Sequence, residues 1–351
     1  MKVLFVADRR VDAGSVQALA NYSRAGDKLG HTMAVYGSPD PRFGDMHVST
    51  DVTAFDYLVF VFESKLRWMS GLQLARILAG VPRHRRAILD ADGMYNHPVV
   101  LDGYDHNHAS EREQGEWRAY YAELADRIFQ PTLAPREPAV EPLLFYGYDP
   151  ESVRSEQPPS EKAFDILHVA HNWWRWRELS CRLLPAIEEI RSRVGTIAFV
   201  GAWWEGAPRW AEALGLEAAF EVDSARLRRL AIELRPPVAY RDVIATMSTG
   251  RVNIMTQRPL LRYLQFVTSK YFEIFTADTT PLVMIDPEQA ELIYGPAGRV
   301  LTLDGRIGDR VLEALANPTR YRRIVQAVRE YLSMRHSYHQ RVLELVGALE
   351  R

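Results

Sequence analysis

The stretch with the most evident chemistry is residues 268–283, "TSKYFEIFTADTTPLV", where a short polar run leads into a helix that carries one acid. Unpaired amides at a helix start, with the hydroxyls of Thr268 and Ser269 and the charge of Lys270, suit a phosphate. Glu273 lies on the same helix face as Lys270 and can accept hydrogen bonds from ribose hydroxyls. A capping box does not explain Glu273, which lies four residues after Ser269, but a surface Lys270–Glu273 ion pair remains an alternative.

A second set of acids and a histidine follows an apolar run in "ILDADGMYNHP", residues 88–98. Asp90, Asp92 and His97 are candidates for the general base that activates an acceptor hydroxyl, or for groups that orient it. The "DADG" sequence also resembles the start of a calcium loop, but counting from Asp90 the twelfth position is Leu101 rather than an acid, which excludes calcium. The alternative is a turn that is capped by the aspartates.

Nothing else in the sequence predicts a metal centre. His106 and His108 stand near Asp105, but they supply only part of a metal site, and we expect them to be solvated loop histidines. Cys181 is the single cysteine, which excludes an internal disulfide and a cysteine-based zinc cluster. We therefore predict no metal and no cofactor.

These residues must be positioned by the elements around them, and the 351-residue chain is long enough for two domains. Apolar runs alternate with amphipathic segments in both halves, which predicts an α/β protein with two doubly wound, Rossmann-like domains facing across a cleft. The predicted divisions are residues 1–148 for the acceptor-side domain, 149–163 for a polar linker, 164–325 for the nucleotide-sugar domain, and 326–351 for helices that cross back to the first domain. Ligands of such folds bind at the carboxyl ends of the strands.

From about residue 251 to 341 the chain resembles the C-terminal half of GT-B glycosyltransferases of the group-1 branch that includes CgeB-like proteins. The matching segments are "VTSKYFEIFTADTTPLV", "AELIYGPAG" and "HSYHQR", with "PPVAYRDVIATMSTGRVNIMTQRP" and "FDILHVAHNWWRWRE" upstream. In the related E-x7-E enzymes Glu273 would be the second glutamate, whereas Gln265 stands at the first position. This departure leaves open any role of that first acid and the stereochemical outcome.

The resemblance implies a nucleotide-diphosphate sugar as donor, bound without a metal, whose ribose is held by Glu273 and whose diphosphate is held by residues 268–270. It also implies further donor-binding residues. These are Arg175 and Arg177 for the diphosphate, Tyr240 and Val243 for the base, and Gly14, whose turn lines the cleft of a GT-B fold. Arginine suits the diphosphate because its planar guanidinium pairs two phosphate oxygens.

The function predicted from these observations is a hexosyltransferase-type glycosyltransferase that acts on an acceptor hydroxyl or amine. Alternatives are a nucleotide-sugar epimerase of the same fold and a non-catalytic module that binds nucleotide or glycan. A DNA-modifying glucosyltransferase is a weaker alternative, because 43 basic and 45 acidic residues give a net charge of −2 and DNA affinity depends on phosphate neutralisation. We expect a cytoplasmic protein without a transmembrane segment, whose partners are a nucleotide sugar and an acceptor rather than nucleic acid.

Overall fold

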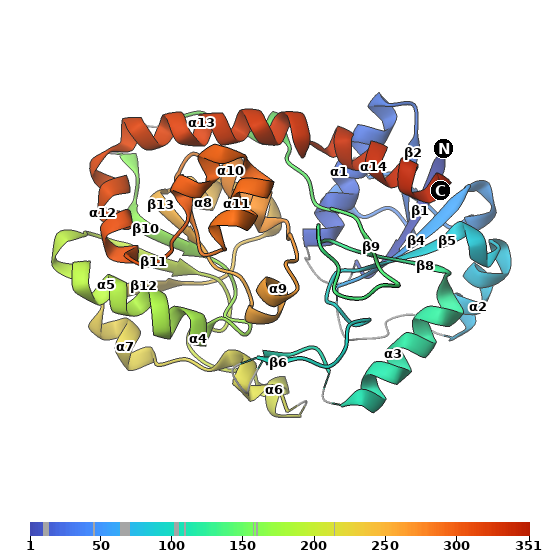
Figure 1. Ribbon diagram of the computed structural model, residues 1–351, viewed down its shortest axis with the longest axis horizontal. Coiled ribbons are helices and arrows are strands. Elements are labelled where there is room, and N and C mark those ends of the chain that lie inside the picture. Colours follow the sequence, from blue (N-terminus) through green and yellow to red (C-terminus); the bar gives the residue numbers. More distant parts are fainter. Residues whose placement is uncertain are drawn as a thin grey trace.

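The computed structural model describes residues 1–9, 14–44, 46–63, 71–101, 105–108, 110–156, 158, 161–213 and 215–351. Two α/β lobes lie side by side, and a long helix joins them along one edge (Figure 1). The predicted α/β class is therefore confirmed. Among the described residues, no helix combines the length and the apolar character that a membrane crossing requires.

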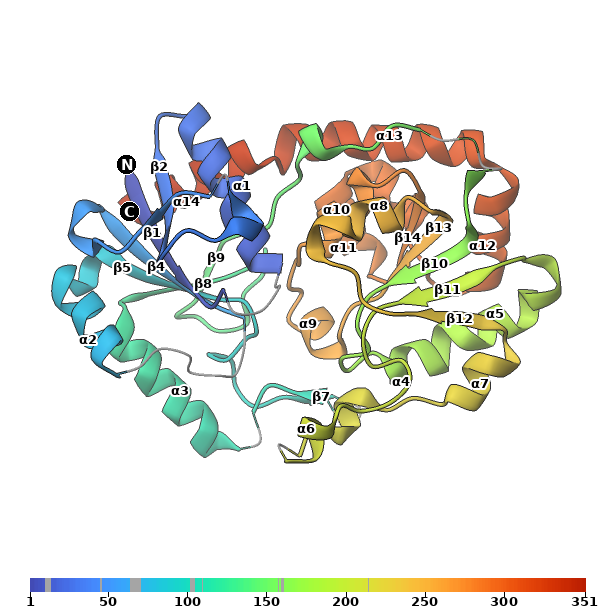
Figure 2. The same cartoon turned by 180° about the vertical axis from the view of Figure 1, so that it is seen from behind.

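The first lobe is built on a seven-stranded parallel sheet of order β3-β2-β1-β4-β5-β8-β9. Its strands are β1 (Lys2–Ala7), β2 (Thr32–Tyr36), β3 (Val48–Ser49), β4 (Tyr57–Phe62), β5 (Arg86–Asp90), β8 (Arg127–Gln130) and β9 (Glu141–Pro142), and its helices are α1 (Gly14–Lys28), α2 (Gly71–Gly80) and α3 (Glu111–Leu124). A separate antiparallel hairpin, β6 (Val100–Leu101) and β7 (Asp105–His106), extends toward the other lobe (Figure 2).

The second lobe holds a five-stranded parallel sheet of order β12-β11-β10-β13-β14. Its strands are β10 (Phe164–Val169), β11 (Ile197–Val200), β12 (Ile232–Arg235), β13 (Gly250–Met255) and β14 (Thr280–Val283). Its helices are α4 (Trp176–Glu178), α5 (Leu184–Ile190), α6 (Arg209–Ala213), α7 (Ser224–Arg229), α8 (Val243–Met247), α9 (Pro259–Tyr263), α10 (Lys270–Thr276), α11 (Pro287–Tyr294) and α12 (Ile307–Ala316).

The strand sequences explain why both sheets are central layers. β1, β4, β5 and β11 are buried along nearly their whole length, as expected for parallel strands that are covered on both faces. Each sheet reverses its strand order once, between β1 and β4 in the first lobe and between β10 and β13 in the second. A ligand is therefore expected at the carboxyl ends of these four strands.

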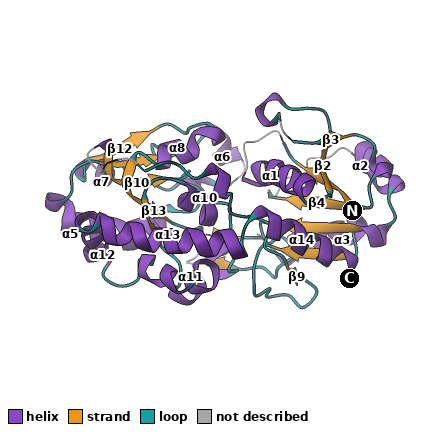
Figure 3. Cartoon of the chain, turned by 90° about the horizontal axis from the view of Figure 1, so that it is seen from above, coloured by secondary structure: helices purple, strands orange, loops and turns teal. Residues whose placement is uncertain are grey.

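Two helices return the chain to the first lobe. α13 (Pro318–Arg335) runs along the second lobe, and α14 (Tyr338–Glu350) packs on α1 (Figure 3). One cluster of buried apolar side chains extends from α1 through α14 into the second lobe. Arg341 on α14 is 1% exposed and donates to the carbonyl oxygens of Leu144 and Arg335. The two lobes are thus joined by packed side chains as well as by the polypeptide.

Candidate functional site

A small cavity lies at the switch point of the second sheet. Its volume, with open solvent included, is about 270 Å³. The polar residues that line it are His168 near the end of β10, Arg175 in the loop that follows, Asn253 and Thr256 in and after β13, and Lys270 at the start of α10. Three buried polar atoms of this cavity have no hydrogen-bond partner among the described residues, namely His168 Nε2, Arg175 Nε and Thr256 Oγ1. Because buried polar atoms are rarely left unsatisfied, a polar ligand group or a water is expected in this cavity.

The cations of this cavity come from the two elements that the sequence singled out. Burial lowers the pKa of Arg175 to about 10, an effect to which Arg258 adds, yet Arg175 remains charged at neutral pH. Its Nη1 donates to the carbonyl oxygens of His171 and Trp173, which fixes the guanidinium in the loop after β10. Lys270 comes from α10, so that two positive charges from separate elements border one space.

The polar segment before α10 forms a compact group with Glu273. Lys270 Nζ lies 3.4 Å from Glu273 Oε2, so the ion pair considered as an alternative does form, but Glu273 is only 8% exposed. The hydroxyl of Tyr240 donates to Glu273 Oε1, and the pKa of this tyrosine is raised by burial and by the neighbouring carboxylate. Ser269 makes no side-chain cap, in agreement with the rejection of a capping box. Tyr240 therefore lies beside the carboxylate assigned to the ribose.

Two of the predicted donor residues lie elsewhere. The Arg177 Nε atom is 3.5 Å from Glu221 Oε2 on a half-exposed surface, and Arg177 is not among the residues that line the cavity. Val243 begins α8 with 8% exposure and packs into the main apolar cluster. A base contact through the Val243 side chain is therefore not supported by its packing, and Arg177 would have to leave Glu221 to reach a diphosphate.

The two lobes meet at the start of α10. A Cβ atom on Gly14, at the start of α1, would lie 2.6 Å from Ser269 Oγ, so a larger residue there would require the Ser269 side chain to move. Thr268 immediately precedes Ser269 and is partly buried. Gly14 and Ser269 thus bring the two lobes into contact beside the start of α10.

An acid that the sequence analysis did not select lies at the same place. Glu63 directly follows β4 and accepts hydrogen bonds from the Ser15 backbone amide (3.2 Å) and from the Tyr146 hydroxyl (3.0 Å). Burial raises its pKa, and the charge of Asp92 raises it further. Asp92 follows β5, the strand next to β4, so both carboxylates lie at the carboxyl edge of the first sheet. The available signal was an acid placed immediately after the apolar run "FDYLVFVF".

The position of Asp90 does not agree with its predicted catalytic role. It is fully buried and accepts four hydrogen bonds, from the backbone amides of Met94 and Tyr95 and from the side chains of Tyr121 and Gln130. With this coordination the carboxylate caps the turn after β5, which was the alternative interpretation, and it is not accessible to an acceptor.

His97 lies at the rim rather than inside. Its side chain is 72% exposed, with Nε2 3.7 Å from Glu137 Oε2, and its backbone amide donates to the same carboxylate. Asp92, the third predicted acceptor-side residue, is close enough to Glu63 for its charge to raise the pKa of that acid.

Gln265 also lies outside the donor cavity. Its φ of 55° is left-handed, its side chain is exposed, and it lines a separate pocket with Asp286 and Glu288. An acid at position 265 would therefore not reach the donor cavity in this arrangement.

The β6–β7 hairpin closes the far side of the cleft. Asp105 on β7 is fully buried and accepts from Arg258 Nε (2.9 Å) and from the backbone amide of Leu260 (2.8 Å). The expectation of solvated histidines is wrong for His108, which is 1% exposed and bonds the Met94 carbonyl oxygen through Nε2 (2.8 Å). In the part of the chain that the structure describes, no group of three or more potential ligands could hold a metal ion.

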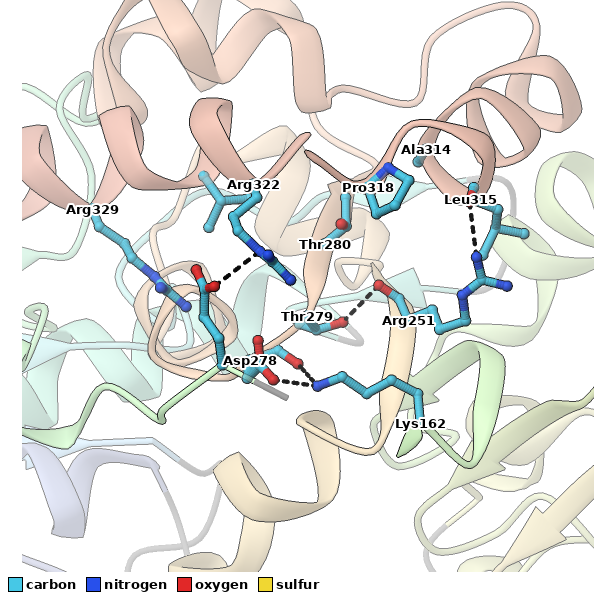
Figure 4. A pocket seen from close by; sticks show the side chains of 12 residues that line it. Lys162, Arg251, Asp278, Thr279, Thr280, Ala314, Leu315, Pro318, Arg322 and Arg329 are labelled. Atoms are coloured by element: carbon cyan, nitrogen blue, oxygen red, sulfur yellow. Dashed lines mark hydrogen bonds and ion pairs between the residues drawn. The ribbon is translucent and has the colours of Figure 1, made fainter. Parts of the chain in front are cut away.

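A second cavity lies at the opposite, amino-terminal ends of β13 and β14 (Figure 4). It is rich in cations, but each has a partner: Lys162 pairs with Asp278, Arg251 with Asp165 (2.8 Å), Arg322 with Glu156 (3.2 Å), and Arg329 donates to the carbonyl oxygens of Phe275 and Ala277. These contacts fasten the interdomain linker and α13 to the second sheet. The cations of this second cavity thus serve to join the linker and α13 to the second sheet.

A glycosyl transferase-like family model matches residues 177–347, which include α10, α13 and most of α14. No curated protein sequence matches significantly.

The fold comparison covers the entire chain. An α-glucosyltransferase in complex with UDP has a TM-score of 0.66 at 11% identity, over 100% of both chains. A second α-glucosyltransferase structure, with UDP-glucose and DNA containing an abasic site, gives 0.64 at 11% identity over 100% of this chain and 99% of the other. The BGT of phage T4 with UDP and Mn²⁺ gives 0.57 at 12% identity over 100% of both chains. The predicted GT-B fold is confirmed over the whole chain, and residues 177–347 are similar to the glycosyl transferase-like family.

Proposed function

We propose that this protein transfers a hexose from a nucleotide-diphosphate sugar, with UDP as the first nucleotide to test, to an acceptor bound between its lobes. The observation that carries this proposal is the cavity with three unpartnered polar atoms, which is bordered by Lys270 and adjoins Glu273. Solved structures of the same fold hold UDP or UDP-glucose, which supports the choice of nucleotide.

In this proposal the second lobe binds the donor and the first lobe supplies the base. Lys270 and Arg175 offset the charge that develops on the leaving diphosphate, and Glu273 accepts hydrogen bonds from the ribose. On the other side of the cleft, Asp92 or Glu63 removes the proton of the acceptor hydroxyl. The raised pKa of Glu63 favours it as a base, because a base is most effective when its pKa approaches the working pH.

The acceptor has a second candidate class besides a small molecule or glycan. Several structures of similar fold contain DNA, so the comparisons do not support the expectation that nucleic acid is an unlikely partner. The net charge of −2 still argues against tight binding of a polyanion. Incubation with DNA containing a hydroxymethylated base, and separately with small hydroxyl acceptors, tests the two classes directly.

Metal independence also stays part of the proposal. A similar structure holds Mn²⁺, so each activity assay should be run with EDTA and with added Mn²⁺. Equal rates under both conditions are expected if Lys270 and Arg175 supply the positive charge, whereas a requirement for Mn²⁺ would refute that assignment.

The experiment that tests the donor is a thermal-shift screen with UDP, GDP, dTDP and ADP and their sugar conjugates. A ligand at about 100 times its Kd stabilises the folded chain by about 2.7 kcal/mol, enough for a shift of several degrees. A shift with one base, followed by stoichiometric release of that diphosphate during sugar transfer, would also exclude an epimerase. No shift with any of them would favour a non-catalytic module and overturn the proposal.

A further inference from the structure

His168 is held in a defined protonation state by its surroundings. It is 1% exposed and packs against the rings of Phe199 and Trp204, and its Nδ1 lies 2.8 Å from the Ile254 carbonyl oxygen. Because a carbonyl oxygen only accepts, Nδ1 must carry the proton. Burial, Arg175 and Lys270 together lower the pKa of His168 to about 4, so the ring is neutral at physiological pH. Nε2 is therefore a bare acceptor.

Within the described part of the chain this acceptor has no partner, although it lines the cavity beside Arg175 and Lys270. A diphosphate would not satisfy it, because phosphate oxygens that are ionised only accept hydrogen bonds. Arg175 Nε–H, also unpartnered, can only donate. A hydroxyl matches this pair, since it donates its proton to His168 and its oxygen accepts from Arg175.

The residues around the cavity indicate which part of the donor carries this hydroxyl. In the proposed function Glu273 holds the ribose and Lys270 the diphosphate, and Lys270 both pairs with Glu273 and lines the cavity. A nucleotide sugar has the order ribose, diphosphate, sugar. Because the sugar is the next group of the donor after the diphosphate at Lys270, the cavity hydroxyl is assigned to the sugar to be transferred.

We propose that His168 Nε2 accepts a hydrogen bond from one hydroxyl of the donor sugar and so selects donors that carry a hydroxyl at that position. This inference rests on the proposed function. His168 contributes to binding, so its replacement should lower the affinity for the nucleotide sugar and leave the affinity for the nucleoside diphosphate unchanged.

Two substitutions distinguish the contribution of His168 Nε2 from that of Nδ1. His168→Asn can keep the donation to the Ile254 carbonyl oxygen at the position of Nδ1, but it removes Nε2. His168→Gln can place an amide oxygen near the position of Nε2. Isothermal titration with UDP and with UDP-glucose should show that His168→Asn weakens UDP-glucose roughly 3- to 10-fold with UDP unchanged, and that His168→Gln restores part of the loss.

The outcomes distinguish the proposals. If His168→Asn lowered the affinities for UDP and UDP-glucose equally, or lowered neither, the proposed role of His168 would be wrong. The proposal that the protein binds a nucleotide would still stand. No binding of either nucleotide to the unaltered protein would overturn the proposed UDP-sugar donor and this inference with it.

A measurement on the unaltered chain guards against variants that fail to fold. The four monodeoxy analogues of UDP-glucose, at positions 2, 3, 4 and 6 of the sugar, should include one that loses the same 3- to 10-fold affinity. If all four bind as tightly as UDP-glucose, no hydroxyl is read at His168 and the inference is wrong.

Discussion

Replacement of Glu273 by glutamine tests the donor site most directly. Glutamine keeps the size of the side chain and an oxygen that can accept from Tyr240, but it removes the charge that pairs with Lys270. A hydrogen bond to a charged group contributes about 1.5–3 kcal/mol, which corresponds to a change of roughly 10- to 150-fold in Kd. Because Tyr240 and Lys270 share the carboxylate with the ribose, we expect a loss of UDP affinity toward the lower end of this range.

The assay is titration calorimetry with UDP, with thermal unfolding of each variant as a check on folding. A matched control is Glu291→Gln on α11, which breaks an exposed ion pair with Arg299 and does not line the donor cavity. Exposed ion pairs contribute about 0–1 kcal/mol to stability, and this one should leave UDP affinity unchanged. Wild-type affinity in Glu273→Gln, with the control also unchanged, would refute the ribose assignment.

Three further predictions concern the first lobe and its contact with the second. Asp92→Asn and Glu63→Gln should each lower kcat at least tenfold, measured by UDP release, with UDP affinity preserved. His97→Ala should have the smallest effect on kcat of the three variants, because the His97 side chain is exposed. An unchanged kcat in both Asp92→Asn and Glu63→Gln would show that neither acid is the base. Folding raises the pKa of Glu63 above its usual 4.5, so between these two pKa values the folded state binds more protons than the unfolded state. The free energy of unfolding therefore falls as the pH rises through this range. In urea titrations from pH 4 upward, Glu63→Gln should remove this decline, and a pH profile identical to that of the unaltered protein would contradict the raised pKa of Glu63. Asp105→Asn leaves Arg258 buried without its counter-charge and should lower the free energy of unfolding by about 3–5 kcal/mol, and a loss below about 1 kcal/mol in urea would show that the pair is dispensable.

Much of the fold follows from local sequence pattern. Apolar runs such as "KVLFVA" and "YLVFVF" became buried parallel strands because their periodicity does not depend on distant residues. Gly30 follows two residues after the end of α1, with a φ of +74° that glycine adopts without strain. Placement of Lys270 and Glu273 on one helix face was likewise a local inference.

The roles of individual acids were harder to predict, because they depend on strand order. Glu63 and Asp92 are 29 positions apart in sequence, and they become neighbours only because β4 pairs with β5. Asp90 looked as available as Asp92 until the donors of Tyr121 and Gln130, from two other elements, were placed around it. Hydrogen-bond partners that come from distant segments leave no periodic signal in a single sequence.

In the proposed mechanism the second lobe binds the nucleotide and the first lobe activates the acceptor, and the variants together test this division. His168, Arg175, Lys270 and Glu273 all belong to the second lobe, so a nucleotide can bind there without any group of the first. The acids at the other carboxyl edge reach the reaction only if the lobes stay apposed, which the Asp105 contacts help to maintain. Donor-site variants should therefore change UDP affinity, whereas a variant of Asp105 should lower turnover more than it lowers UDP affinity. If Asp105→Asn weakened UDP and turnover in equal proportion, the donor site would have to include the first lobe.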